Sequence, residues 1–389
     1  MRDLASRMAD LGTETAFDVL ARARALEAQG RRVLHLEIGE PDFPTPPHVV
    51  EAGVRALRDG HTRYGPPPGL PALREAICER MLAERGVRST PDEVVVTPGA
   101  KPILFLALLA TVGPGDEVLV PDPGFPIYES VVRFAGARVV PVPVREESGF
   151  SFDVDAAERL VTPRTRMLIF NSPANPTGGA TTPRDLERIA ALAERHDLWV
   201  IADEIYARIS YGETHQSMAA LPGMRERVIL SDGFSKAYAM TGWRLGFGVV
   251  PRRLAEPITR LVINSNSCTA AFVQLAGLAA LRGPQDAVDR MVAEFRRRRD
   301  LVVSGLRGIP GLRCAEPRGA FYAFPDVRGL RISADELASR LLEEHGVATL
   351  SGTAFGPGGD GHLRISYVSA PEVLQEALER IRTAVAELV

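Results

Sequence analysis

The sequence predicts an α/β protein with a large domain, built on a mostly parallel mixed sheet covered by helices, and a smaller α/β domain. Short apolar runs alternate with helical patterns through the middle of the chain, which is typical of a sheet covered on both faces. The chain has 389 residues, enough for two sizeable cores. We expect strands at residues 118–120, 139–144, 167–170, 199–202, 228–230 and 245–250, with a helix at 183–195.

The flanking segments complete this pattern. Before the first of these strands, residues 94–96 predict a further strand and residues 103–110 a buried helix. A long charged helix over about 284–306 leads out of the sheet region, and its arginine run 296–299 indicates a solvated face. A second, smaller α/β unit follows from about residue 300, with a short strand at 363–368.

Composition limits the classes of function. The net charge of −3 argues against a nucleic-acid or acidic-membrane partner. Three scattered cysteines are too few for a disulfide framework or a zinc site, so we expect no metal and a reducing cytoplasm. The N-terminus lacks the apolar core of a signal peptide, and the apolar run 103–110 is shorter than the roughly 20 residues that span a bilayer.

Lys236 is the most informative residue, because of the segment SDGFSKAYAMTGWRLG at 231–246. A nucleophilic lysine needs a desolvated turn that lowers the pKa of its amine below about 10.4. Arg244 and backbone N–H groups near Gly233 and Ser235 could bind a phosphate. A lysine beside a phosphate site suggests pyridoxal phosphate held as a Schiff base, although a surface lysine and arginine on an ordinary loop would also fit.

Two predicted strands end in polar residues that suit this cofactor. Asp203 follows the strand WVIA, where an ionised carboxylate could pair with the ring nitrogen, and Tyr206 could bond the ring hydroxyl. Asp203 could instead cap a helix that begins at Glu204. Asn175 lies in the turn NPTG after the strand 167–170, where its amide could donate to a phenolate-type oxygen, or it could belong to a plain loop.

Two further positions suggest anion binding. The turn TPGA at 97–100 opens the helix over 103–110, and a glycine-bearing turn at a helix start leaves N–H groups free for an anion. Arg364 follows the glycine-rich loop 356–361 and could hold a carboxylate in a bidentate contact. A surface salt bridge is the alternative for Arg364 in this arginine-rich chain.

These motifs together resemble the class I/II aminotransferases, which are fold type I pyridoxal-phosphate enzymes, and are most similar to the bacterial aspartate aminotransferase branch. The resemblance runs from LEIGEPDF at 36–43 to HLRISY at 362–367. GFSK at 233–236, followed by Met240, Gly242, Arg244 and Gly246, matches the attachment-site pattern of the family. NPTG at 175–178 and DEIY at 203–206 stand in the expected order.

The resemblance implies a role for each matching residue. Lys236 holds pyridoxal 5′-phosphate and carries the proton between substrate and cofactor, Asp203 pairs with the ring nitrogen, and Asn175 and Tyr206 bond the ring oxygen. The remaining contacts are to the phosphate (Gly99, Ala100, Lys101, Gly233, Arg244 and, from the other subunit of a homodimer, Tyr64), the ring face (Phe125) and the substrate (Arg364 on the α-carboxylate, Gly39, Asn175). It also implies a large domain at 48–290 and a small domain formed by 1–47 and 291–389.

The chain departs from the family pattern at two positions. The ring-stacking residue is Phe125, where many relatives have Trp or Tyr, and Phe offers no polar edge. Three residues before the lysine stands Gly233, where many relatives have a hydroxyl side chain, so backbone groups must bind the phosphate there. Both departures leave open which side chain the substrate carries.

The expected reaction is ping-pong transfer of an amino group between an L-amino acid and a 2-oxo acid. Lys101 favours an aspartate- or glutamate-like substrate, because a lysine at this position touches the distal carboxylate in the most similar relatives. Phe17, Ile38 and Phe125 could instead line an apolar pocket. A β-lyase or synthase on the same fold and a secondary-metabolism aminotransferase remain alternatives. A transcription regulator is disfavoured, since the motif at 40–42 leaves no room for a preceding DNA-binding module.

Overall fold

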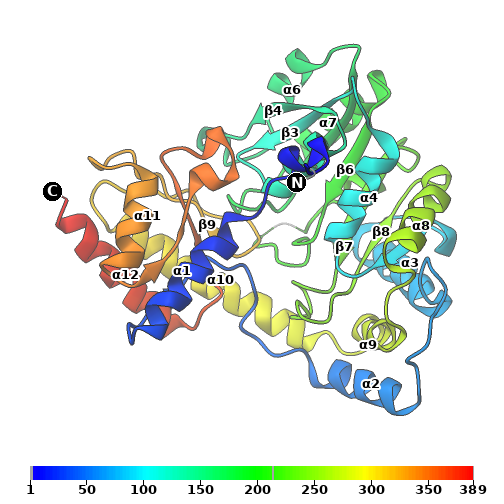
Figure 1. Ribbon diagram of the computed structural model, residues 1–389, viewed down its shortest axis with the longest axis horizontal. Coiled ribbons are helices and arrows are strands. Elements are labelled where there is room, and N and C mark those ends of the chain that lie inside the picture. The colour runs from blue at the N-terminus through cyan, green and yellow to red at the C-terminus, as the bar shows by residue number, and fades with distance from the viewer. Residues whose placement is uncertain (1–2, 213, 389) are drawn as a thin grey trace.

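The computed structural model describes residues 3–212 and 214–388 of the chain. A seven-stranded mixed sheet forms the middle of the larger part of the molecule, which lies on the right in Figure 1. In spatial order the strands are β2 (Val94–Thr97), β8 (Gly246–Val249), β7 (Val228–Gly233), β6 (Trp199–Asp203), β5 (Thr165–Asn171), β3 (Glu117–Asp122) and β4 (Arg138–Pro143). The five strands from β7 to β4 are parallel, and β8 is antiparallel to both of its neighbours. Each strand expected from the sequence is present, with bounds that differ by a few residues.

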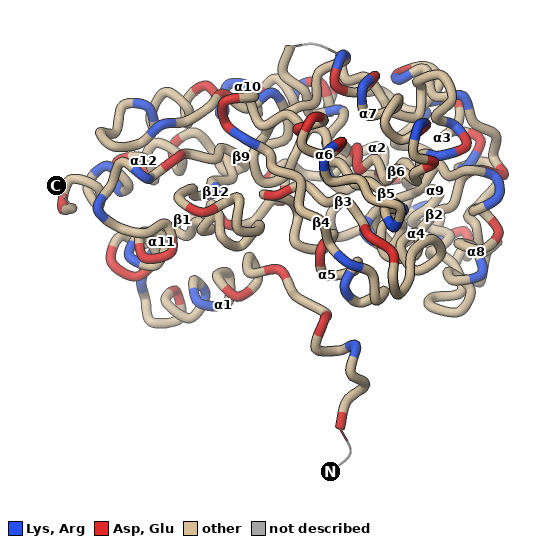
Figure 2. Tube along the Cα trace, turned by 90° about the horizontal axis from the view of Figure 1, so that it is seen from above, with Lys and Arg blue, Asp and Glu red and all other residues tan. Residues whose placement is uncertain are grey.

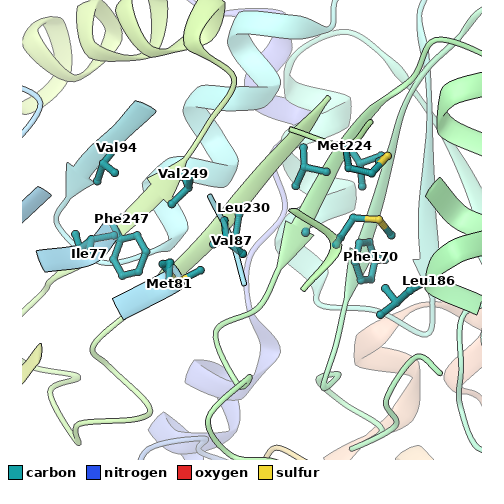
Figure 3. Packing of buried hydrophobic residues seen from close by; sticks show 14 of the residues in the cluster. Ile77, Met81, Val87, Val94, Phe170, Leu186, Met224, Leu230, Phe247 and Val249 are labelled. Atoms are coloured by element: carbon teal, nitrogen blue, oxygen red, sulfur yellow. The ribbon is translucent and has the colours of Figure 1, made fainter. Parts of the chain in front are cut away.

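Helices cover both faces of this sheet because side chains alternate along buried strands. On one face, Leu168 and Phe170 join a core with α3 (Pro71–Arg85), α6 (Val154–Leu160), α7 (Pro183–Arg195) and α9 (Ala271–Arg282). Figure 3 shows this core, with Ile77 and Met81 of α3 beside Phe247. On the other face, Met167 and Ile169 pack against α4 (Lys101–Thr111), α5 (Pro126–Phe134) and α8 (Arg252–Asn266). The expected helix 183–195 is confirmed as α7.

A second core gathers the C-terminal segment around short strands. The three-stranded antiparallel sheet β11 (Leu350–Ser351), β12 (Leu363–Ser366) and β9 (Tyr322–Ala323) packs with α11 (Ala334–Glu343) and α12 (Pro371–Ala386). N-terminal β1 (Leu34–His35) pairs in parallel with β10 (Val347–Ala348), and α1 (Thr15–Ala28) contacts β10 and β11. Residues from the two ends of the chain therefore share one core.

The long helix α10 (Asp286–Arg307) connects the two cores, and α2 (Pro47–Arg58) packs on α9 beside the large sheet. Because α10 is continuous through residue 290, the expected boundary between 290 and 291 falls inside a helix, and the domain division stays a prediction. Arg298 and Arg299 of the arginine run are buried in ion pairs with Asp42, Glu294 and Asp300, so the expected solvated face is wrong for these two residues.

Acidic and basic residues are interspersed along the described part of the chain, as the colours of the tube in Figure 2 show. Within the described residues, no helix combines the length and the apolar character that crossing a membrane requires.

Candidate functional site

A cavity of about 440 Å³ lies where the carboxyl ends of the parallel strands β5 and β6 face residues of the second core. Open α/β sheets bind ligands at this edge. Most of the residues singled out from the sequence line this one cavity: Gly39, Ala100, Lys101, Phe125, Asn175, Asp203, Tyr206, Lys236, Arg244 and Arg364. They come from positions spread over more than 300 residues of sequence, and the fold brings them together.

Lys236 lies in the turn that follows β7, with its side chain in the cavity. Its Nζ donates a hydrogen bond to the Gly39 carbonyl oxygen at 2.5 Å. Desolvation lowers the pKa of the Lys236 amine to about 8. At neutral pH, Lys236 is therefore the neutral, nucleophilic amine in a larger fraction of the molecules than a lysine in water would be.

Asp203 ends β6 with its carboxylate buried at the cavity floor. The Tyr128 hydroxyl donates to Asp203 Oδ2 at 2.7 Å, and the Ile205 N–H donates to Oδ1 at 3.3 Å. Burial raises the pKa of the Asp203 carboxyl to about 6. The alternative that Asp203 caps a helix is wrong, because residues 205–208 form a turn. A buried carboxylate here suits a cationic ring nitrogen.

Arg364 projects from β12 and is 4% exposed. Its Nη1 donates to Asn175 Oδ1 at 3.0 Å and its Nη2 to the Glu37 carbonyl oxygen. The guanidinium lies 4.6 Å from the ring centre of Tyr322. Its Nε has no hydrogen-bond partner among the described residues. The surface salt-bridge alternative for Arg364 is therefore wrong, and a buried guanidinium with unused donor capacity suits a carboxylate ligand.

The start of α4 could hold an anion. Ala100 and Lys101, which line the cavity, stand at the first turn of the helix, where a helix leaves N–H groups without intrahelical partners. Arg244 donates to the Thr241 carbonyl oxygen at 2.8 Å and to the Pro98 carbonyl oxygen at 3.3 Å. Gly99 has a φ of +91°, which favours glycine, and a Cβ there would lie 2.3 Å from Arg244 Nη2, so the guanidinium would have to move.

Gly99 is not among the residues that line the cavity, and two further expected site residues, Gly233 and Tyr64, also lie outside the lining. Gly233 ends β7, where a Cβ would come within 3.0 Å of the Gly246 Cα, so the residue keeps two strands in close contact. Tyr64 is 89% exposed on the surface. The phosphate contacts expected of both residues stay predictions.

Motif reasoning missed three residues that belong to the site. Tyr128 holds Asp203, the Tyr322 hydroxyl lies 2.9 Å from the Tyr206 hydroxyl, and Glu14 receives a hydrogen bond from Lys101 Nζ. A signal existed for Tyr128, since it follows Phe125 by three residues and α5 begins between them. Tyr322 and Glu14 carry no comparable local pattern.

The cavity also holds both lysines of the chain. Of 46 lysine and arginine residues, two are lysines, Lys101 and Lys236, and both line this cavity. Arginine fills the cationic positions elsewhere, including the buried ion pairs. Composition therefore sets these two positions apart from the other cationic positions of the chain.

Comparison with known proteins agrees with this geometry. The family model for aminotransferases of class I and II matches residues 31–381. The chain belongs to this family. An arginine–pyruvate transaminase of Pseudomonas aeruginosa is 41% identical over all of this chain and 98% of its own length. An aspartate aminotransferase of Musicola paradisiaca is 38% identical over 100% of this chain and 98% of its own. The structure of Thermus thermophilus aspartate aminotransferase with maleate has a TM-score of 0.94 and 40% identity, and covers 99% of this chain and 100% of that one.

The aminotransferase uses pyridoxal phosphate to move an amino group between an amino acid and a 2-oxo acid, as its family does. The residues of the cavity fit that cofactor in size and in charge. A primary amine of lowered pKa, a buried carboxylate and the start of a helix line the same cavity. The expectations of fold type, enzyme class and cofactor are confirmed.

Replacing Asp203 by Asn should change how stability depends on pH once the cofactor is removed. The folded pKa of about 6 lies above the unfolded value of 3.8, so unfolding releases a proton between these two pH values. The free energy of unfolding of the wild type should therefore fall, relative to the variant, as pH rises through this window, and stay level above it.

Urea unfolding of both proteins at a series of pH values measures the difference. The exposed residue Asp10, replaced by Asn, is the matched control and should follow the wild type. Parallel pH profiles for Asp203→Asn and wild type would show that the buried carboxyl does not carry the shift.

Proposed function

We propose that this aminotransferase acts on amino acids with a carboxylate side chain, aspartate or glutamate, paired with a 2-oxo acid in a ping-pong reaction. The observation that carries the proposal is that the cavity contains Lys101, a cation that could bind a carboxylate, in addition to Arg364. Lys101 Nζ lies 5.4 Å from the ring centre of Phe125 and is paired with a carboxylate, that of Glu14. A dicarboxylic substrate needs two such cations, Arg364 for its α-carboxylate and Lys101 for its distal one.

The contacts support the proposed cofactor-binding roles. The N–H groups at Ala100 and Lys101 and the Arg244 guanidinium bind the phosphate, with Gly99 in the turn beside them and backbone at Gly233 supporting the attachment turn. Asp203, held by Tyr128, keeps the ring nitrogen protonated. The cofactor then supplies an electron sink for the substrate carbanion.

Asn175 and Tyr206 bond the ring oxygen. Because Asn175 Oδ1 already accepts from Arg364, its amide nitrogen is the group left to donate, so Asn175 joins the ring contact to the substrate contact. Phe125 covers one ring face, and Gly39 lines the substrate end, where a Cβ would collide with the Tyr322 hydroxyl at 1.8 Å.

Lys236 carries the proton in the reaction. Its amine lies in the cavity with Asp203 and Arg364 and donates to the Gly39 carbonyl, which fixes its direction. With a pKa of about 8, the amine can both accept and return a proton near neutral pH. Thr241 and Ser235 line the same cavity and help to exclude water from the lysine.

The enzyme works as a homodimer with shared sites, in the cytoplasm. Tyr64 supports the dimer, since a tyrosine that is 89% exposed in one subunit is free to reach the phosphate of another. The cysteines Cys78, Cys268 and Cys314 are all free, which suits a reducing compartment.

An absorbance titration tests the proposed function. The purified protein should show the visible band of the covalently held cofactor, and Lys236→Ala should lack it. Aspartate or glutamate alone should bleach the band and release one equivalent of the matching 2-oxo acid, while Lys101→Ala should keep the band. A protein that cannot be reconstituted, or one that releases pyruvate and ammonia without an acceptor, would contradict transamination.

Replacing Lys101 by Ala should raise the KM for aspartate by about tenfold, which corresponds to about 1.4 kcal/mol of lost charge contact. The KM for alanine should change little, because alanine has no distal carboxylate. Lys101→Arg is the matched control, since it keeps the charge and alters only its shape. Equal losses for aspartate and alanine would remove Lys101 from substrate recognition.

Mixing two inactive variants tests the shared site. Tyr64→Phe and Lys236→Ala should regain partial activity when their subunits exchange, because one hybrid site then has both wild-type residues. Exchange is verified first with differently tagged subunits. Exchanged hybrids without activity would place Tyr64 outside the partner's site.

A further inference from the structure

The ion pair between Glu14 and Lys101 has an unusual position. Glu14 stands just before α1, where a short polar side chain would normally cap the helix, but its side chain makes no capping bond to any described residue. Its carboxylate instead accepts from Lys101 Nζ, 87 residues away. The Glu14 side chain is 19% exposed and that of Lys101 45%, so the pair is partly screened by water.

The pair joins the two parts of the protein across the cavity. Glu14 leads into α1, which packs on β10 and β11 in the second core, whereas Lys101 begins α4 on the large sheet. Both residues line the cavity. The charge of Glu14 also raises the pKa of Lys236 and of Arg364 against the effect of burial, so its carboxylate stands in the field of the reacting groups.

Apolar side chains line the cavity together with the pair. Phe17, Leu104 and Phe125 line the same cavity, and the Lys101 ammonium lies over the Phe125 ring. With Glu14 in place, this end of the cavity has no net charge and suits a neutral side chain. With Glu14 displaced, Lys101 offers a free ammonium to a carboxylate.

We propose that Glu14 is a specificity-determining residue, whose carboxylate occupies the place on Lys101 that the distal carboxylate of a dicarboxylic substrate would take. A neutral substrate leaves the pair closed, and a dicarboxylic substrate opens it. The inference rests on the proposed role of Lys101. A ping-pong enzyme must admit two different substrates in turn to one cavity, and an internal counter-ion lets the cavity match a charged and an uncharged side chain.

The exchange of one carboxylate for another explains why such a switch can be reversible. A partly exposed ion pair contributes little net stability, so an incoming carboxylate can replace Glu14 at small cost. While it remains nearby, however, Glu14 repels the bound distal carboxylate. Removing its charge should therefore strengthen the binding of dicarboxylates by about five- to tenfold.

Glu14→Gln in the holoenzyme tests the inference, because it removes the charge and keeps the shape. The KM for aspartate and the dissociation constant of succinate, an unreactive dicarboxylate, should both fall about five- to tenfold. The KM for alanine should stay level or rise. In a Lys101→Ala background, the same substitution should leave the binding of succinate within about twofold. Asp18→Asn, an exposed acid on α1, is the matched control.

The composition allows a second readout that does not depend on turnover. Protein labelled with 13C at lysine Cε should give two side-chain NMR resonances, from Lys101 and Lys236. The Lys101 resonance should move in Glu14→Gln, and succinate should move it in wild type at a higher concentration than in the variant. A Lys101 resonance that does not move in Glu14→Gln would overturn the inference that the Glu14 carboxylate competes for Lys101.

The outcomes separate this inference from the proposed function. If Lys101→Ala weakens aspartate binding and Glu14→Gln changes nothing, the inference that Glu14 competes for Lys101 is wrong, but the proposal of a dicarboxylic substrate is retained. If Lys101→Ala leaves aspartate binding unchanged, both the inference and the proposed dicarboxylic substrate are wrong. A Glu14→Gln effect of equal size with and without Lys101 would also overturn the inference, because it would act without the lysine.

Discussion

The burial of the Asp203 carboxylate is the constraint around which the site is arranged. A carboxylate at the end of a buried strand is disfavoured in its charged form unless a partner is supplied. The Tyr128 hydroxyl and the Ile205 N–H each donate one hydrogen bond to Asp203, but burial still raises the pKa of the carboxyl, so these bonds do not compensate fully. A cationic ring nitrogen would complete the compensation. Burial also lowers the pKa of Lys236, so one desolvated region contains both of the groups proposed to act as acid partner and nucleophile.

A buried ion network behind the cavity keeps this edge in place. Arg85 of α3 donates to Glu204 Oε2 at 3.1 Å and to Asp232 Oδ2 at 2.6 Å. Glu204 directly follows Asp203, and Asp232 directly precedes Gly233, so one guanidinium joins the ends of β6 and β7. Networks of this kind add little net stability, but they penalise any shift of one partner alone. Asp203 and the turn that carries Lys236 therefore keep a fixed separation.

The sequence predicted the residues that local patterns mark and missed those that tertiary packing supplies. Asp203 and Asn175 were found because polar residues at the ends of apolar strands must meet at one sheet edge. Lys236 and Arg244 were found because their turn matches a known motif. Tyr322 is brought to the cavity by β9, which pairs with β12 through the core of the second unit, and nothing within its own segment signals that pairing. The Arg298 and Arg299 ion pairs were missed for the same reason, since their acidic partners include residues far away in sequence.

The two lysines connect composition to mechanism. The role proposed for position 236 requires a primary amine, because a guanidinium, always protonated, could neither form the covalent link nor exchange a proton near neutral pH. No such requirement applies at position 101, where any cation could pair with Glu14. What an ammonium offers there is a compact charge without a fixed plane, which can turn from one carboxylate to another, whereas a guanidinium bound through two parallel hydrogen bonds would hold its partner more firmly. A lysine among 44 arginines at this point is what a cavity with exchangeable carboxylates needs.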